Sequence, residues 1–232
     1  MSGWQAVVFD LDDTLYPERD YVLGGFRAVA AWAEAQLGIP TAQGFAELNH
    51  LFAQGSRGDT FDRWLAAHGR PADDLVPQLL QVYRGHEPAL VPFAGVPELL
   101  ASLGRRYRLG LVSDGYLAVQ QRKLAALHLA QHFDAVIFSD AWGRTAWKPS
   151  AKPFEAVLQR LAVEAAKAVY VADNPAKDFV GARQVGMFTL RLRQTGGEYA
   201  QLSPPSAGHA PDLTVACLVG LEQVLMSSQP VR

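Results

Sequence analysis

The sequence of 232 residues is poor in cysteine and has almost no excess of charge. Its single cysteine, Cys217, excludes an intramolecular disulfide and any zinc site built from several cysteines. We therefore expect a reducing compartment and predict a cytoplasmic protein. The 21 basic and 23 acidic residues nearly cancel, to a formal net charge of −2. This balance disfavours a nucleic acid polymer or an anionic membrane surface as a partner.

Long apolar runs and several common catalytic motifs are also missing. The first apolar stretch ends at Asp10, and no later run approaches the ~20 apolar residues that a membrane span needs. The sequence contains no Gly-x4-Gly-Lys-Ser/Thr loop, no His-Glu-x2-His motif and no Gly-x-Ser-x-Gly motif. Its six histidines are scattered singly, a pattern more typical of surface or core residues than of metal ligands. The hydrophobic content of 49% is enough for one large domain or two small ones.

Short apolar runs rich in β-branched or aromatic residues predict buried strands. They lie at residues 6–9, 109–112, 135–138, 168–172 and 188–192. Helical patterns follow at residues 96–103, 117–127, 153–161 and 175–185, the last opening on a proline suited to a first helical turn. Strands and helices that alternate in this way are typical of a parallel sheet covered on both faces. We therefore predict an α/β fold with a doubly wound, mostly parallel sheet.

One long segment interrupts this alternation. From residue 16 to about residue 85 the chain has no strand-like run, and apolar residues recur at helical spacing in four stretches. Pro88 and Pro92 then break the helical pattern. We expect a bundle of roughly four helices inserted after the first strand. The predicted domains are an α/β core of residues 1–15 and 93–232 and a helical domain of residues 16–92.

Acidic and hydroxyl side chains follow the predicted strands where each strand ends. They are Asp10, Asp12 and Thr14 after the first strand, Ser113 and Asp114 after the second, and Asp173 and then Asp178 after the fourth. Lys148 stands in the loop after the third strand. Ligands of open parallel sheets bind beyond the carboxyl ends of the strands, so we expect these side chains to converge. Each one alone has an ordinary interpretation as a helix cap, a turn or a surface residue, but the ordered set favours a site.

The residue types in this set favour phosphoryl chemistry. Clustered carboxylates repel one another unless a hard divalent cation neutralises them, and such oxygen ligands suit Mg²⁺. A carboxylate can attack phosphorus and form an aspartyl-phosphate when a metal and a cation offset the charge of the phosphate. Lys148 would provide that cation, and the Ser113 hydroxyl would help to hold the phosphoryl oxygens. We therefore predict a magnesium site and a small phosphorylated metabolite as the partner.

Four motifs, taken in order, resemble those of the haloacid dehalogenase-like (HAD) hydrolases. They are VVFDLDDTL at 7–15, LGLVSDG at 109–115, KPSAKPF at 148–154 and VYVADNPAKDFVGARQVGM at 169–187. The chain is similar to phosphatases of this family that carry a helical cap after the first strand. The resemblance implies a Rossmann-like core in which Asp10 is the nucleophile and Asp12 is the general acid and base. It therefore implies a magnesium-dependent phosphatase that hydrolyses a small phosphate monoester, such as a sugar phosphate or a nucleotide.

The same resemblance implies the ligands of the metal and the phosphate. Mg²⁺ would be held by Asp10, Asp173 and the carbonyl of Asp12, with Asp178 bound through water or just outside the ligands. The predicted phosphate-binding residues are Thr14, Ser113, Asp114 and Lys148. The sequence departs from the family pattern at Ala172, where glycine is usual, at Asp114, where asparagine is commoner, and at Trp147, directly before the lysine. None of these departures removes a functional group, but Asp114 adds a negative charge close to the phosphate site.

Alternative functions remain open at this point. Dehalogenases of the family lack an acid two positions after the nucleophile, so Asp12 argues against that activity. A phosphomutase uses the same acid and differs in how well its cap excludes water. A non-catalytic phosphate-binding or interaction module would be expected to lack one of Asp10, Asp12, Lys148 and Asp173, and all are present. Substrate-contact candidates in the helical segment are Arg19, Tyr21, His50, Arg57, Arg63 and Trp64.

Overall fold

The computed structural model describes residues 3–194 and 196–227. The chain divides into two compact units. The first, here called the sheet unit, runs up to Pro17 and resumes at Val91, and the second, the helical unit, is Glu18–Leu90. These junctions lie two residues from the predicted domain boundaries at 15/16 and 92/93. The remaining residues of the predicted core, 1–2, 195 and 228–232, lie outside the described residues.

The described part of the sheet unit contains one parallel sheet, in the order β3-β2-β1-β4-β5-β6. Its strands are β1 (Ala6–Phe9), β2 (Arg108–Ser113), β3 (Ala135–Phe138), β4 (Ala168–Ala172), β5 (Phe188–Leu192) and β6 (Leu213–Val215). The predicted α/β class with a doubly wound parallel sheet is confirmed. The sequence did not predict β6, which has only three residues and is mostly exposed. Because β1 lies between β2 and β4, the strand order reverses beside β1, and parallel sheets bind ligands at this point.

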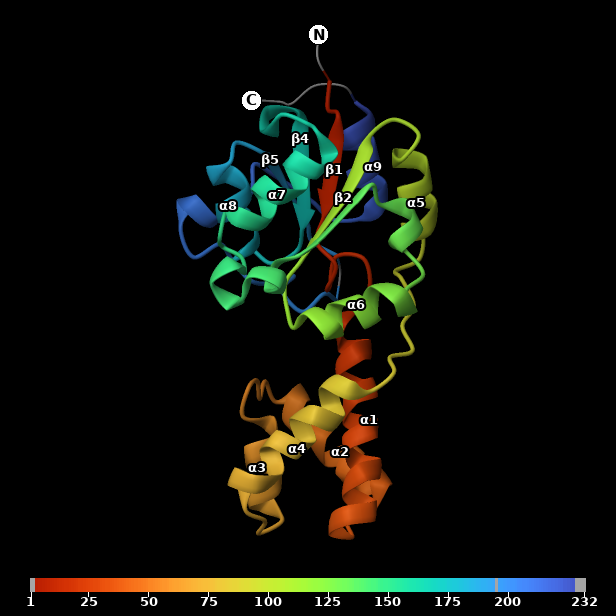
Figure 1. Ribbon diagram of the computed structural model, residues 1–232, viewed down its shortest axis with the longest axis vertical. Helices are drawn as coiled ribbons and strands as arrows, with labels where there is room; N and C mark the ends of the chain where they lie inside the picture. Colours follow the sequence, from red (N-terminus) through yellow and green to blue (C-terminus); the bar gives the residue numbers. More distant parts are fainter. Residues whose placement is uncertain (1–2, 195, 228–232) are drawn as a thin grey trace. The chain divides into compact units, whose positions relative to one another are not determined.

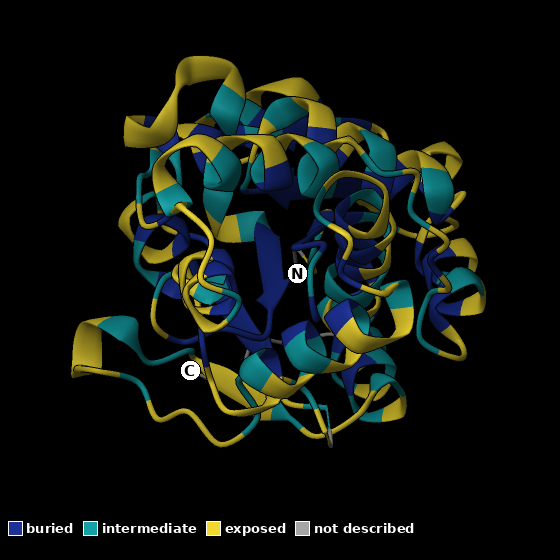
Figure 2. Ribbon diagram, turned by 90° about the horizontal axis from the view of Figure 1, so that it is seen from below, coloured by how far each residue is buried: buried dark blue, intermediate teal, exposed yellow. Residues whose placement is uncertain are grey.

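Helices cover both faces of the sheet. They are α5 (Val96–Leu103), α6 (Leu117–Ala126), α7 (Lys152–Leu161), α8 (Asp178–Gln184) and α9 (Leu218–Met226). Short 3₁₀ turns lie at Ala130–His132, Ser139–Trp142, Arg144–Ala146, Ala165–Lys167 and Ala207–His209. Figure 1 shows α7 and α8 side by side over one face, where Phe154 and Phe179 pack on Tyr170 and its neighbours. Every residue of β1 and β4 is buried, so the opposite face is covered as well (Figure 2).

Helix α8 begins three residues later than the sequence predicts. The predicted start was Pro175, a residue suited to a first helical turn, but the helix starts at Asp178. The Asn174 side chain accepts a hydrogen bond from the backbone N–H of Ala176 at 2.9 Å. Asp178 Oδ2 accepts one from the backbone N–H of Asn174 at 3.0 Å. These side-chain bonds stabilise a turn before the helix, and they place Asp178 in its first turn.

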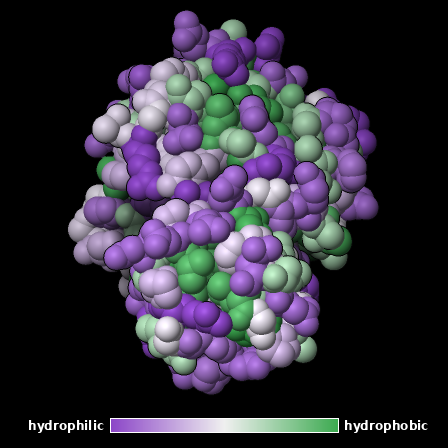
Figure 3. All heavy atoms as spheres, turned by 60° about the horizontal axis from the view of Figure 1, so that its bottom comes forward, coloured by the Kyte–Doolittle hydropathy of each residue, from purple (hydrophilic) through white to green (hydrophobic). Residues whose placement is uncertain are grey.

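The helical unit contains α1 (Glu18–Leu37), α2 (Thr41–Ala53), α3 (Thr60–Ala67) and α4 (Ala72–Gly85). Its core is formed by apolar side chains from all four helices, among them Phe26, Leu48, Phe61, Trp64 and Leu79. None of the helices in the described ranges combines the length and apolar character that crossing a bilayer requires. The face drawn in Figure 3 is mainly hydrophilic, with smaller hydrophobic areas.

A close contact between α8 and the loop after Lys148 gives a test of the fold. A Cβ atom at Gly181 would lie 2.5 Å from the backbone oxygen of Ser150 and 2.7 Å from that of Pro149. We expect Gly181→Ala to lower the free energy of unfolding by about 1–3 kcal/mol, because backbone must shift to admit the methyl group. Urea unfolding would measure this loss. Gly208→Ala is the control, since its Cβ would meet nothing closer than 3.7 Å. Equal stability of the two variants would contradict the packing described here.

Candidate active site

Three carboxylates meet at the carboxyl edge of the sheet. Asp10 follows β1, Asp173 follows β4, and Asp178 opens α8. Their exposed fractions are only 4%, 8% and 0%, and one oxygen of each lies within 4.8 Å of the others. The sequence prediction placed these residues at one edge, and the structure brings them together.

Lys148 lies among these carboxylates. Its Nζ atom is 2.5 Å from Asp10 Oδ1 and 2.7 Å from Asp178 Oδ1, and it donates a hydrogen bond to the Tyr170 hydroxyl at 3.0 Å. Burial alone would lower the pKa of Lys148, but the charges of Asp10 and Asp178 raise it well above its ordinary value. The ammonium group therefore stays charged. Sequence analysis did not assign a role to Tyr170, because an aromatic residue within an apolar strand predicts only burial.

The oxygens of Asp173 show how a cation would fit. Asp173 Oδ1 accepts a hydrogen bond from Thr14 Oγ1 at 3.3 Å, whereas Oδ2 is buried and has no hydrogen-bond partner among the described residues. Burial, together with the charges of Asp178 and Asp10, raises the pKa of Asp173 well above its ordinary value. A buried carboxylate oxygen without a partner is costly unless a cation or proton compensates it. The carboxylates of Asp10, Asp173 and Asp178 thus fit a hard divalent cation such as Mg²⁺.

The pKa of Asp10 is strongly raised in this cluster. Burial raises its pKa from 3.8 to about 7, with Asp178 adding to the effect and Lys148 opposing it. In the metal-free protein Asp10 therefore competes for a proton near neutral pH. A bound divalent cation would favour the ionised carboxylate, the form that can act as a nucleophile.

Asp12 lies in a separate group of contacts. Its Oδ1 atom accepts hydrogen bonds from Lys123 Nζ at 2.8 Å and from the Tyr16 hydroxyl at 2.5 Å. Its Oδ2 atom accepts one from Gln120 Nε2 at 3.1 Å. Burial alone would raise the pKa of Asp12, but the charge of Lys123 and the hydrogen bonds from Lys123 and Tyr16 hold it below its ordinary value. Sequence analysis missed all three donors. Gln120 and Lys123 lie three residues apart, beside apolar residues of the same helix, and this pattern could have indicated a buried polar contact.

The remaining predicted residues have protein partners. The Ser113 hydroxyl donates to Gln120 Oε1 at 3.2 Å. Asp114 accepts hydrogen bonds on both oxygens, from Ser139 Oγ at 2.6 Å and from the backbone N–H of Lys148 at 2.9 Å. Asp114 thereby ties the loop that carries Lys148 to the end of β2. Phosphate contacts by Ser113, Asp114 and Thr14 stay predictions.

Comparison with known proteins identifies the family. Residues 7–192 match the family described as haloacid dehalogenase-like hydrolase. The chain belongs to this family. It is 33% identical to glyceraldehyde 3-phosphate phosphatase from Methanopyrus kandleri over 91% of this chain and 92% of that protein. It is 31% identical to ribulose-1,5-bisphosphate 5-phosphatase from Halopiger xanaduensis, over 80% and 83% of the two chains.

A solved structure agrees with this assignment. The crystal structure of 2-haloacid dehalogenase from Pseudomonas syringae pv. Tomato DC3000 covers 96% of this chain and 98% of its own, with a TM-score of 0.65 and 25% identity. The predicted membership in the HAD hydrolases is confirmed, and so is the predicted enzyme class of hydrolase.

The raised pKa of Asp10 predicts how the stability of the metal-free protein depends on pH. The folded state binds the Asp10 proton more tightly than the unfolded state, so this stabilisation is complete below pH 3.8 and is lost as the pH rises through about 7. Over this range we expect wild type to lose up to about 4 kcal/mol relative to Asp10→Asn. Saturating Mg²⁺ should therefore raise the Tm of wild type more at about pH 8 than at about pH 5.

Thermal unfolding of both proteins, with EDTA and with Mg²⁺, measures these effects. Asp10→Asn is the matched control, because it keeps the shape of the side chain and removes the titrating group. Parallel pH profiles of wild type and Asp10→Asn, or a Mg²⁺ shift that is independent of pH, would contradict the assignment.

Proposed function

We propose that this protein is a magnesium-dependent phosphatase that hydrolyses a small phosphate monoester through an aspartyl-phosphate on Asp10. The observation that carries the proposal is the buried ammonium group of Lys148, 2.5 Å from Asp10, beside an Asp173 oxygen that has no partner among the described residues. Such a cluster can neutralise an incoming phosphate dianion only with the help of a cation. Family membership and the named activities of the two relatives support the same function.

The proposed reaction has two steps. An oxygen of Asp10 attacks phosphorus, the bond from phosphorus to the ester oxygen breaks, and the leaving oxygen takes a proton from Asp12. Asp12 must enter this step protonated, although Lys123 and Tyr16 lower its pKa. Asp12 then accepts a proton from a water molecule that attacks the aspartyl-phosphate, and this attack releases inorganic phosphate and restores Asp10. Lys148 offsets negative charge throughout. Mg²⁺, held by Asp10, Asp173 and Asp178, would supply further charge neutralisation at the phosphoryl oxygens.

A panel of phosphate monoesters tests this proposal directly. We expect Mg²⁺-dependent release of inorganic phosphate from at least one small phosphorylated metabolite, with glyceraldehyde 3-phosphate as the first candidate because a relative is named for it. EDTA and Asp10→Asn should each remove more than about 99% of the activity, since each removes a component that the chemistry requires. Turnover in metal-free buffer or by Asp10→Asn would contradict the proposal. A rearranged sugar phosphate, formed without phosphate release, would instead indicate a mutase.

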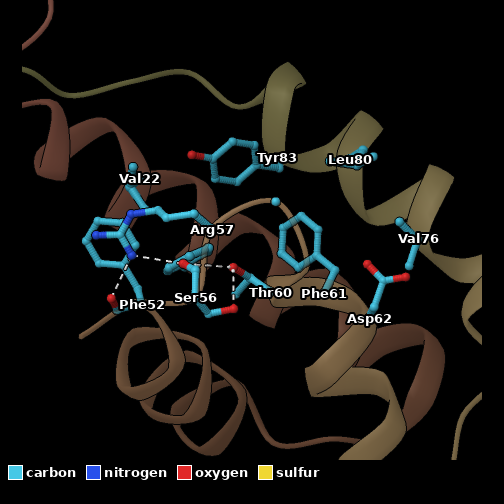
Figure 4. Close-up of a pocket in the computed structure, with 12 residues that line it drawn as sticks. Val22, Phe52, Ser56, Arg57, Thr60, Phe61, Asp62, Val76, Leu80 and Tyr83 are labelled. Atoms are coloured by element: carbon cyan, nitrogen blue, oxygen red, sulfur yellow. Dashed lines mark hydrogen bonds between the residues drawn. The ribbon is translucent and has the colours of Figure 1, made fainter. Parts of the chain in front are cut away.

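The helical unit contains a cavity that could select the substrate. Its volume is about 230 Å³, and most of its lining is apolar, including Phe61, Leu80 and Tyr83 (Figure 4). One polar side chain in the lining is Arg57, whose guanidinium group stacks on the Phe52 ring with 3.8 Å to the centroid. Arg57 Nη1 also donates to the backbone oxygens of Phe52 and Ser56, at 2.8 and 2.9 Å. We propose that the helical unit is the cap and that this cavity contributes to the choice of leaving group.

Two other residues that the sequence suggested as substrate contacts, Trp64 and Arg63, do not line this cavity. Trp64 is only 1% exposed and donates to Glu47 at 2.8 Å, so it belongs to the core of the helical unit. Arg63 is exposed and does not line the cavity.

This difference provides a matched pair of variants. We expect Arg57→Met to change the ratio of kcat/KM values between two phosphate esters by about 10-fold, because it removes the positive charge from the cavity that we propose selects the leaving group. Arg63→Met should leave that ratio unchanged. Steady-state kinetics on the same panel measures both variants, and circular dichroism checks their folding. If Arg57→Met lowered activity on every ester by the same factor, the proposal that this cavity selects the substrate would be contradicted.

A further inference from the structure

We propose that Lys123, Gln120 and Tyr16 are positioning residues that hold the Asp12 carboxylate in place for its proton transfers. The inference rests on the proposed phosphatase function. Asp12 lies in the first of the four sequence motifs, whereas the three positioning residues lie outside all four. Three donors from two segments bind one carboxylate: Tyr16 and Lys123 contact Oδ1, and Gln120 contacts Oδ2. Because both oxygens are bound, rotation of the carboxylate would break at least one of these bonds.

The position of α6 explains how these donors reach Asp12. Gln120 and Lys123 are three residues apart, so they share one side of the helix. Their exposed fractions are 3% and 2%. The backbone N–H of Leu117 at the start of α6 donates to Asp140 Oδ2 at 2.9 Å, which anchors the helix to the segment after β3. In Figure 1, α6 crosses the sheet unit at the end where β1 and β2 finish.

Gly115 makes room for the Gln120 side chain. A Cβ atom at this position would lie 2.4 Å from Gln120 Nε2, and the backbone φ of +123° is one that side-chain-bearing residues rarely adopt. Gln120 is also held from its other end, because Oε1 accepts the hydrogen bond from Ser113. The amide is thereby oriented with its NH₂ group toward Asp12.

The two buried lysines of the site therefore serve different carboxylates. Lys148 contacts Asp10 and Asp178, whereas the ion pair of Lys123 at 2.8 Å is with Asp12. A buried ammonium group needs a charged or hydrogen-bonded partner, and Asp12 provides one for Lys123. Proton transfer depends on distances that must be correct to a fraction of an ångström. Fixing Asp12 would thus raise the rate of proton transfer without adding a contact to the substrate.

A double-mutant cycle separates positioning from a general structural role. With nitrophenyl phosphate and saturating Mg²⁺, we expect Lys123→Met to lower kcat by about 10- to 100-fold. KM should change by less than about threefold, because Lys123 acts on Asp12 and not on substrate. In the Asp12→Asn background, the same substitution should change kcat by less than about threefold, because the group that Lys123 positions is already lost.

Two further variants keep the test decisive. Lys167→Met is the matched control, since Lys167 forms a surface ion pair with Glu164 at 3.1 Å, and it should leave kcat unchanged in both backgrounds. If Lys123→Met does not fold, Tyr16→Phe replaces it, because this change removes a single hydroxyl group. It should lower kcat severalfold in wild type and not in Asp12→Asn.

Loss of kcat by the same factor in both backgrounds would overturn the proposal, and so would full activity of Lys123→Met or Tyr16→Phe. The proposed function fails in a different way, because wild type itself would then release no phosphate from any ester.

Discussion

Burial of Lys148 among carboxylates is the interaction on which the rest of the site depends. When all three are ionised, Asp10, Asp173 and Asp178 bring three negative charges to one buried place, and Lys148 balances one of them. Two negative charges remain, which a divalent cation would balance. Charges this close in a buried place interact by several kcal/mol, so small displacements matter. Three features fix the positions of these charged groups. They are the pairing of β1 with β4, the turn before α8, and the hydrogen bond from the Lys148 backbone to Asp114.

The apolar packing of the sheet unit offsets the cost of these buried charges. Strands β1 and β4 are buried on both faces, and α7 and α8 cover one of them with aromatic and aliphatic side chains. Apolar burial of this kind contributes roughly 25 cal/mol per Å². A rigid sheet also fixes the backbone from which Asp10 and Asp173 project. The carboxylate cluster thus lies at the ends of two strands, β1 and β4, that are buried at every residue.

The helical unit is inserted between Pro17 and Val91 and contributes no strand to the sheet. The proposed function assigns chemistry to the sheet unit and substrate selection to the helical unit. With this division, the lining of the cavity can change without altering Asp10 or Lys148. The two relatives are named as phosphatases of different sugar phosphates, a difference that such a division would allow.

The sequence by itself determined the α/β class, five of the strands, and the convergence of Asp10, Asp173 and Lys148. It could do so because apolar runs mark buried strands and parallel strands end at one edge. Only the tertiary structure decided that Lys123 binds Asp12, 111 residues away, and that Asp114 holds the Lys148 loop. Local periodicity carries no information on such distant partners. It also missed β6, whose three mostly exposed residues lead within three positions into the apolar start of α9, and the side-chain turn that delays α8 to Asp178.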